Sequence, residues 1–261
     1  MSKKKQALLT ILETKVIYPV FQPIVDLENG NVVAYESLSR IENKNIDINI
    51  EELFCLAEAY GCVWKLEKLC RDKALKASMN KPSGTKIFLN VDGQIFQDSN
   101  FISGFTNRKL EKFGLLNEDI VFEITERTDI ENYVLLQAIM NHYIDQGYQI
   151  ALDDVGAGYS GLNRVVNTTP NYLKADIELV RNIHLSKSKQ SMMKLLVEYC
   201  DEMGLKLIAE GIETQEELEC ICNLHVHYGQ GYYLGIPDCK FNGVSSQALQ
   251  YLMNIHGMIK T

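Results

Sequence analysis

Residues 120–154 read IVFEITERTDIENYVLLQAIMNHYIDQGYQIALDD, and this stretch decides the fold. It begins and ends with short runs rich in Ile, Val and Phe, which are typical of buried β-strands. Between them, a helical pattern begins at Thr128, where Thr128 and Glu131 have capping-box spacing, and ends at Gly147, a residue suited to the left-handed conformation after a helix. A strand, a helix and a strand in this order predict one unit of a parallel sheet.

Strand-like runs recur along the whole chain. The density of Val, Ile, Phe and Tyr predicts eight of them: 18–25, 32–38, 86–91, 120–125, 149–153, 172–175, 205–209 and 226–233. Helical periodicity separates most of these runs and also covers 50–60 and 63–78. The first two runs are the exception, because Glu28-Asn29-Gly30-Asn31 between them is a turn signal. These two strands are therefore expected to form an antiparallel hairpin.

One hairpin followed by six strand and helix alternations predicts an α/β fold, namely a (β/α)8 TIM-like barrel with an antiparallel first strand. A doubly wound open sheet is the alternative. No linker rich in Pro, Gly or Ser interrupts the 261 residues. We therefore expect residues 1–261 to form a single domain.

The composition excludes several classes of protein. The chain has 26 Lys and Arg against 34 Asp and Glu, a net charge of −8, so it is not expected to bind duplex nucleic acid. No apolar run approaches the roughly 20 residues of a membrane span, and no signal peptide is readable, so we expect no membrane segment and a cytoplasmic location. The 7 cysteines include no Cys-x-x-Cys motif, which argues against a zinc ribbon and a disulfide framework.

Polar residues lie at or near the carboxyl ends of the seven strands after the first, inside otherwise apolar runs. They are Glu36, Asn90, Glu123, Asp153, Asp154, Lys174, Glu210 and Gln230. In a barrel these ends converge on one face, where several carboxylates would repel one another without counterions. Oxygen-only ligation favours a hard cation. We therefore expect Glu36, Asn90, Glu123, Asp153 and Asp154 to hold a pair of Mg²⁺ or Mn²⁺ ions, and we expect Ca²⁺, with its longer bonds, to inhibit.

Seven segments in order resemble the EAL domain family. Glu36-Ser37-Leu38-Ser39-Arg40 is similar to the signature Glu-Ala-Leu-x-Arg. The other six segments are Phe21-Gln22-Pro23-Ile24, Glu123-x-Thr125-Glu126, 153–160 (DDVGAGYS), Lys174-x-Asp176, 209–214 (AEGIET) and 230–233 (QGYY). The resemblance extends from about residue 18 to 237. It implies a barrel that hydrolyses cyclic di-GMP to linear 5′-pGpG with a metal ion, and it favours a homodimer.

The resemblance also implies roles for individual residues. Lys174 and Glu210 are expected to be catalytic, and Glu126 to stabilise a loop. The residues expected to bind substrate are Gln22, Leu38, Arg40, Asp176, Glu213, Gln230 and Pro237. The planar guanidinium of Arg40 suits a phosphate, although an ion pair with a carboxylate at the barrel end would be the structural alternative.

Two other functions fit parts of the pattern. An enolase-type barrel also needs acidic metal ligands and a Lys base, but such enzymes resemble one another in adding a large capping domain, and only about 17 residues precede the first strand. A cyclic di-GMP receptor that binds without hydrolysis would use the same pocket. Receptors of this kind usually lack some of the carboxylates or the Lys, and this chain keeps them all.

Overall fold

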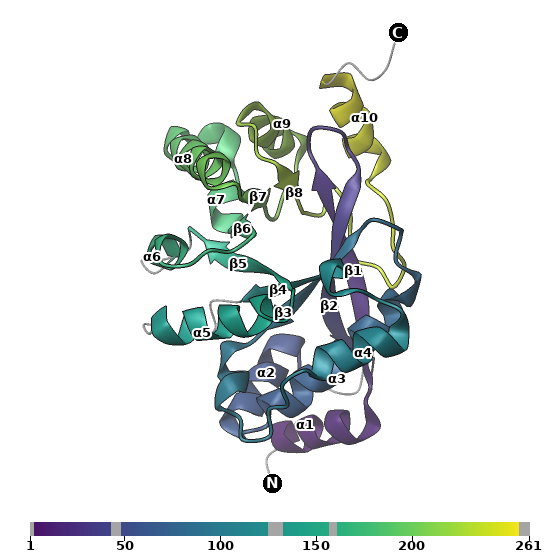
Figure 1. Cartoon of the computed structure of the whole chain (residues 1–261). Helices are drawn as coiled ribbons and strands as arrows, with labels where there is room; N and C mark the ends of the chain where they lie inside the picture. Colours follow the sequence, from purple (N-terminus) through teal and green to yellow (C-terminus); the bar gives the residue numbers. More distant parts are fainter. Residues whose placement is uncertain (1–2, 43–47, 125–132, 157–160, 256–261) are drawn as a thin grey trace.

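The computed structural model describes residues 3–42, 48–124, 133–156 and 161–255. Within them, the strands close into a barrel in the order β1 to β8 (Figure 1). The strands are β1 (Ile17–Asp26), β2 (Val32–Ile41), β3 (Lys86–Val91), β4 (Ile120–Ile124), β5 (Gln149–Val155), β6 (Tyr172–Ala175), β7 (Lys206–Ala209) and β8 (Tyr228–Gly229). The closed order confirms the predicted barrel and excludes an open, doubly wound sheet.

The first strand runs against its neighbours, as the turn signal predicts. Strand β1 pairs antiparallel with both β2 and β8, while every other neighbouring pair is parallel. In the turn, the carboxylate of Asp26 accepts a hydrogen bond from the backbone N–H of Glu28 at 2.9 Å. Gly30 takes a φ of 71°, which a residue without Cβ adopts at little cost.

Helices surround the barrel on its outer side (Figure 1). The α-helices are α1 (Lys3–Thr14), α2 (Ile50–Ala59), α3 (Val63–Ala77), α4 (Phe105–Phe113), α5 (Tyr133–Ile144), α6 (Gly161–Val166), α7 (Ile177–Val180), α8 (Lys187–Met203), α9 (Gln215–Asn223) and α10 (Ser246–Ile255). Short 3-10 helices span Ser78–Asn80, Gly93–Gln97, Asn117–Asp119 and Ile183–Leu185.

Two helix ends that capping and glycine signals predict have the expected backbone geometry. Helix α9 begins with a full capping box, in which Thr214 and Glu217 each satisfy a backbone N–H of the other. Helix α5 ends shortly before Gly147, whose φ of 84° lets the chain reverse into β5. The predicted capping box of Thr128 and Glu131 lies outside the described residues.

The barrel interior has an apolar floor. On seven strands, side chains at corresponding positions form a cluster separate from the main core: Ile24, Ala34, Phe88, Val121, Ala151, Tyr172 and Ile208. The main core lies between the outer faces of the strands and the helices, and it includes Trp64 of α3. Because side chains alternate along a strand, the residue two positions beyond each floor residue also points into the barrel.

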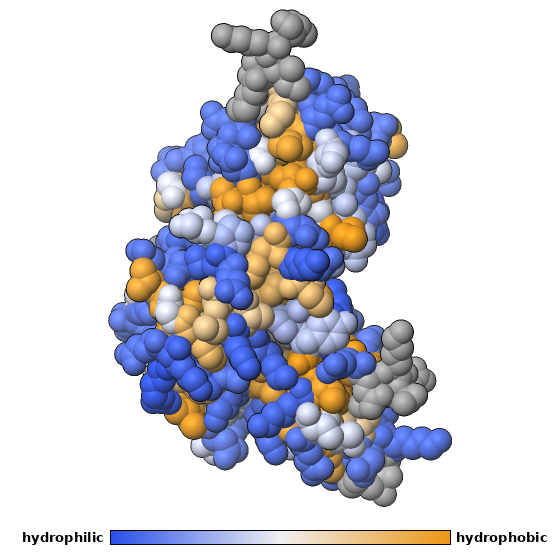
Figure 2. All heavy atoms as spheres, turned by 90° about the vertical axis from the view of Figure 1, so that its right-hand side faces the viewer, coloured by the Kyte–Doolittle hydropathy of each residue, from blue (hydrophilic) through white to orange (hydrophobic). Residues whose placement is uncertain are grey.

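The surface is mixed. Figure 2 shows several apolar patches separated by hydrophilic side chains on the face that it presents. All seven cysteines are free, as their spacing predicts. Among the described residues, no helix is long and apolar enough to cross a membrane.

Two elements differ from the sequence prediction. Strand β8 is confined to Tyr228–Gly229, shorter than the predicted 226–233, because the chain turns at Gly231. A Cβ at Gly231 would lie 2.2 Å from the backbone of Ile212, so this turn requires a glycine. Helix α1 was not predicted; it is short, and its buried face consists of Leu8, Ile11 and Leu12.

Candidate active site

The carboxyl ends of the strands carry a polar layer directly above the apolar floor. The layer follows from strand alternation, since every member except Gln230 lies two residues from a floor residue, and Gln230 lies two residues after Tyr228, which packs against the floor. Its members are Gln22, Glu36, Asn90, Glu123, Asp153, Lys174, Glu210 and Gln230. On the antiparallel β1 the order is reversed, so Gln22 precedes Ile24 and pairs with Glu36. The structure thus brings together the strand-end residues that the sequence predicts.

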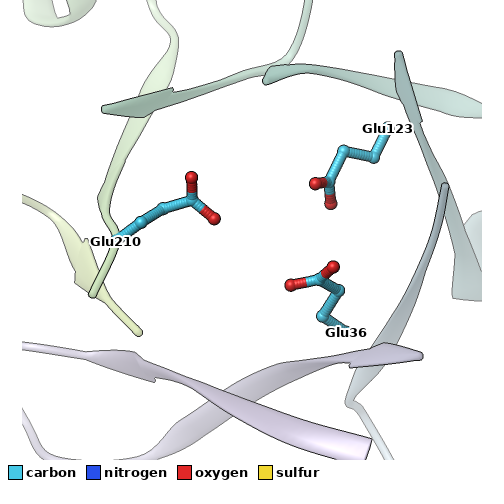
Figure 3. Close-up of side chains that lie close together, drawn as sticks. All are labelled: Glu36, Glu123 and Glu210. Carbon is cyan, nitrogen blue, oxygen red and sulfur yellow. The ribbon is translucent and has the colours of Figure 1, made fainter. Parts of the chain in front are cut away.

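Three glutamates from distant parts of the chain point toward one another in the barrel opening (Figure 3). Glu36, Glu123 and Glu210 each offer a carboxylate oxygen, and these oxygens lie within 4.8 Å of one another. Asp153, Asp154 and Glu210 form a second group of the same size. Glu210, predicted as a catalytic residue, therefore also belongs to both candidate metal-binding groups.

Lys174 lies at the centre of these carboxylates. Its Nζ is 2.6 Å from Glu210, 3.5 Å from Asp153 and 3.6 Å from Glu36, and it contacts Glu123 directly. The side chain is 1% exposed. The surrounding carboxylates, Asp153 first, raise the pKa of Lys174 well above its usual range despite burial. The lysine therefore stays charged and acts as a hydrogen-bond donor rather than a base at neutral pH.

One ammonium does not neutralise this many carboxylates. Burial, followed by the charge of Glu36, raises the pKa of Glu123 well above its usual range. Burial also raises the pKa of Glu210. Asp154 is raised to a pKa of about 7 by burial and by the charges of Asp153 and Asp176. Raised pKa values mean that these carboxylates bind a proton or another cation more readily than an isolated carboxylate does.

The donor set fits a hard divalent cation. The buried Oε2 of Glu123 and Oδ1 of Asp153 accept no hydrogen bond from any described residue. All the converging ligand atoms are oxygens of carboxylates or of the Asn90 amide, which suit Mg²⁺ or Mn²⁺ better than zinc. Asn90 donates to Glu36 at 3.0 Å, and Gln230 donates to the other oxygen of Glu36 at 2.6 Å. These amides fix the orientation of Glu36.

Asp154 has an unusual backbone. Its φ is 56°, in the left-handed region that a non-glycine residue rarely enters. The pairing register between β5 and β6 shifts at this point, between Leu152 and Val155. The carboxyl of Asp176, whose charge helps to raise the pKa of Asp154, caps α7 by accepting from the N–H of Glu178 at 2.7 Å. Strain of this kind is common where a side chain is aimed into a functional site.

An open cavity of about 300 Å³ adjoins the polar layer. Leu38 and Arg40 line it together with Glu36, Asn90 and Asp153. The Arg40 guanidinium donates to the carbonyl of Ser39 at 2.9 Å, and it pairs with no carboxylate among the described residues. Arg40 therefore contributes a guanidinium to the lining of the cavity beside the polar layer.

Two predicted residues that the structure describes are not joined to the cluster. Glu213 is exposed, and its backbone N–H donates to Glu217 at 2.9 Å. Pro237 is half-buried, and no hydrogen bond or ion pair links it to the polar layer within the described residues. Glu126 lies outside the described residues.

Sequence reasoning missed one buried charged pair. Glu67 and Arg71 of α3 are buried and line the same cavity. Their signal was present, because a carboxylate and a guanidinium four residues apart in a core-facing helix predict an ion pair.

The closed barrel and the carboxylates gathered at its strand ends place this chain among barrel proteins whose site is suited to divalent metal ions. A family model described as the EAL domain matches residues 5–237. The chain belongs to the EAL domain family, which confirms the resemblance of the sequence motifs.

Relatives and solved structures agree with this assignment. The probable cyclic di-GMP phosphodiesterase PdeG of Escherichia coli is 26% identical over 85% of this chain and 44% of its own length. The chain thus spans less than half of this curated relative. A standalone EAL protein of Vibrio cholerae, solved with cyclic di-GMP, is 26% identical with a TM-score of 0.76, covering 89% of this chain and 97% of the other. BlrP1 of Klebsiella pneumoniae, solved with manganese and cyclic di-GMP, is 26% identical with a TM-score of 0.76, covering 85% and 56%.

Proposed function

We propose that this protein is a phosphodiesterase that hydrolyses cyclic di-GMP to linear 5′-pGpG with Mg²⁺ or Mn²⁺. The observation that carries the proposal is the polar layer. Its two candidate metal-binding clusters, each of three acidic residues, have Glu210 in common and lie around the buried Lys174. The relatives named above support the substrate. We further propose that residues 1–261 act as one EAL-type unit.

The residues of the layer suit the steps of phosphodiester hydrolysis. Glu36, Asn90, Glu123, Asp153 and Asp154 would hold a pair of divalent ions, with Glu210 as a further candidate ligand. Such ions, when bound, make an attacking water more acidic and polarise the phosphate. Lys174 would donate a hydrogen bond to the reacting oxygens, stabilising charge that grows on the phosphate. Glu210 would orient the water or accept its proton.

A product assay tests the proposal. The purified chain is incubated with cyclic di-GMP and Mn²⁺, and the nucleotides are separated and identified. We expect 5′-pGpG to accumulate with Mn²⁺ and not with EDTA. Tight binding of intact cyclic di-GMP without any linear product would contradict hydrolysis and favour the receptor.

Calcium is expected to inhibit. Ca²⁺ prefers longer bonds and a higher, looser coordination than Mg²⁺, so it would position and acidify the water poorly. We expect Ca²⁺ added to the Mn²⁺ enzyme to lower the rate while substrate binding persists. Rates that are equal in Ca²⁺ and Mg²⁺ would contradict a site with tight geometry.

The substitution Arg40→Ala is expected to raise KM about tenfold and to change kcat less, because the loss of one charge-assisted contact to a phosphate weakens binding. Steady-state kinetics and the melting temperature are measured together. Lys68→Ala, which removes a cation on α3 whose ammonium lies over the Phe105 ring, serves as the control. An unchanged KM with a lowered melting temperature would assign Arg40 a structural role only.

A homodimer remains a prediction of the family resemblance. Val134 on α5 and Val166 on α6 are among the exposed apolar side chains, at 79% and 73% exposure. Sedimentation equilibrium measures the mass directly.

A further inference from the structure

A buried ion pair on α3 packs against the outer side of the barrel wall and also lines the cavity beside the polar layer. Glu67 and Arg71 are one turn apart on α3 and are 3% and 4% exposed. Their side chains contact each other directly. The proposed chemistry does not use either residue, so their burial needs another explanation.

Glu67 is hydrogen-bonded to the backbone at the carboxyl end of β3. Its Oε2 accepts the backbone N–H of Asp92 at 3.2 Å. Asp92 directly follows β3 and begins the 3-10 helix Gly93–Gln97, because its own carboxylate accepts from the N–H of Gln94 at 2.9 Å. The candidate ligand Asn90 lies two residues before this anchored amide.

Arg71 packs against the neighbouring strand, β4. Its guanidinium lies over the ring of Phe122, 4.9 Å from the centroid. It also donates to Thr106 of α4 at 3.3 Å and to the hydroxyl of Tyr143 of α5 at 3.5 Å. Phe122 faces outward on β4, and the next residue is the candidate ligand Glu123, which faces inward.

The pair therefore contacts the two strand ends that carry neighbouring ligands. Asn90 and Glu123 are opposite each other in the register of β3 and β4. A buried ion pair is commonly no more stabilising than well-packed apolar residues of similar volume, so stability alone does not account for it. Groups behind metal ligands set the position and affinity of those ligands.

We propose that Glu67 and Arg71 are positioning residues, which hold the ends of β3 and β4 so that Asn90 and Glu123 are preorganised for a divalent ion. This inference rests on the proposed metal-dependent function. It assigns a role to two residues for which no hydrogen bond or ion pair with a candidate ligand side chain is present in the described part of the chain.

The test compares stability with metal binding. The double variant Glu67→Leu with Arg71→Met replaces the pair with apolar residues, so we expect its metal-free melting temperature to stay close to that of the wild type. Mn²⁺ binding is measured by the electron paramagnetic resonance signal of free Mn²⁺. We expect the dissociation constant to rise by about 10-fold or more. The matched control, Asp72→Leu with Lys109→Met, removes a more exposed ion pair between α3 and α4 and should bind Mn²⁺ as the wild type does.

A double variant that folds and binds Mn²⁺ with the wild-type constant would overturn the inference. If the double variant does not fold, amide hydrogen exchange on the wild-type protein decides. The Asp92 amide should then be strongly protected without metal, and exchange at the rate of an exposed loop amide would overturn the inference. Failure of the wild type itself to bind Mn²⁺ would instead contradict the proposed function.

Discussion

Replacing Lys174 with Met is expected to lower kcat for cyclic di-GMP by at least about 10²-fold, the scale for losing one preorganised stabilising group. The ammonium contacts or lies near four carboxylates, so no other described cation takes its place at the centre. Methionine keeps most of the length and removes the charge. At saturating Mn²⁺, bound ions would neutralise the carboxylates, so the variant should fold and bind cyclic di-GMP nearly normally.

Three measurements separate a catalytic lysine from one that only balances charge. They are kcat, the dissociation constant of cyclic di-GMP and the melting temperature at saturating Mn²⁺, with the exposed Lys194→Met as the control. If Lys174 acted only through charge balance, metal affinity, stability and activity would fall together. A variant that keeps more than a tenth of the wild-type turnover at saturating Mn²⁺ would remove Lys174 from the mechanism.

The substitution Glu123→Gln is expected to have a still larger effect, a loss of at least about 10³-fold in kcat/KM, or about 4 kcal/mol of transition-state stabilisation. Glu123 is 0% exposed and belongs to the group with Glu36 and Glu210. Gln has the same shape but carries no charge, so it is a poor ligand for a hard cation. Burial and the neighbouring carboxylates raise the pKa of Glu123, so its charged form destabilises the fold when no metal ion is bound. The metal-free variant should therefore be at least as stable as the wild type.

Kinetics and a Mn²⁺ titration test this expectation. Glu118→Gln, on the exposed segment before the same strand, is the control and should change neither quantity. If Glu123→Gln bound Mn²⁺ with wild-type affinity and kept its rate, Glu123 would not be a ligand, and the assignment of the polar layer would be wrong.

The sequence predicts the barrel and most of the polar layer for one physical reason. Each inward position two residues past an apolar floor residue carries a polar group, and period-two alternation makes that visible without a structure. Glu36 above Ala34 and Glu123 above Val121 are examples. Closure of the barrel then brings these positions together, because the parallel strands end on the same face.

Other features depend on geometry that spacing does not encode. The left-handed backbone of Asp154 and the shift in register beside it cannot be read from the spacing of residues along the sequence. Glu213 and Pro237 were predicted from family resemblance alone, without any strand pattern that would direct them to the cluster. The role of Glu67 also required the structure, because its contact with the Asp92 amide joins residues 25 positions apart.

We propose that the polar layer is a catalytic metal centre rather than a receptor pocket. The most direct test loads the protein with cyclic di-GMP in Ca²⁺, removes unbound nucleotide, then exchanges Ca²⁺ for Mn²⁺ and follows the bound nucleotide by chromatography. We expect cyclic di-GMP to stay intact in Ca²⁺ and to be converted to 5′-pGpG after the exchange. Nucleotide that stays bound and cyclic in saturating Mn²⁺ for hours would contradict the account.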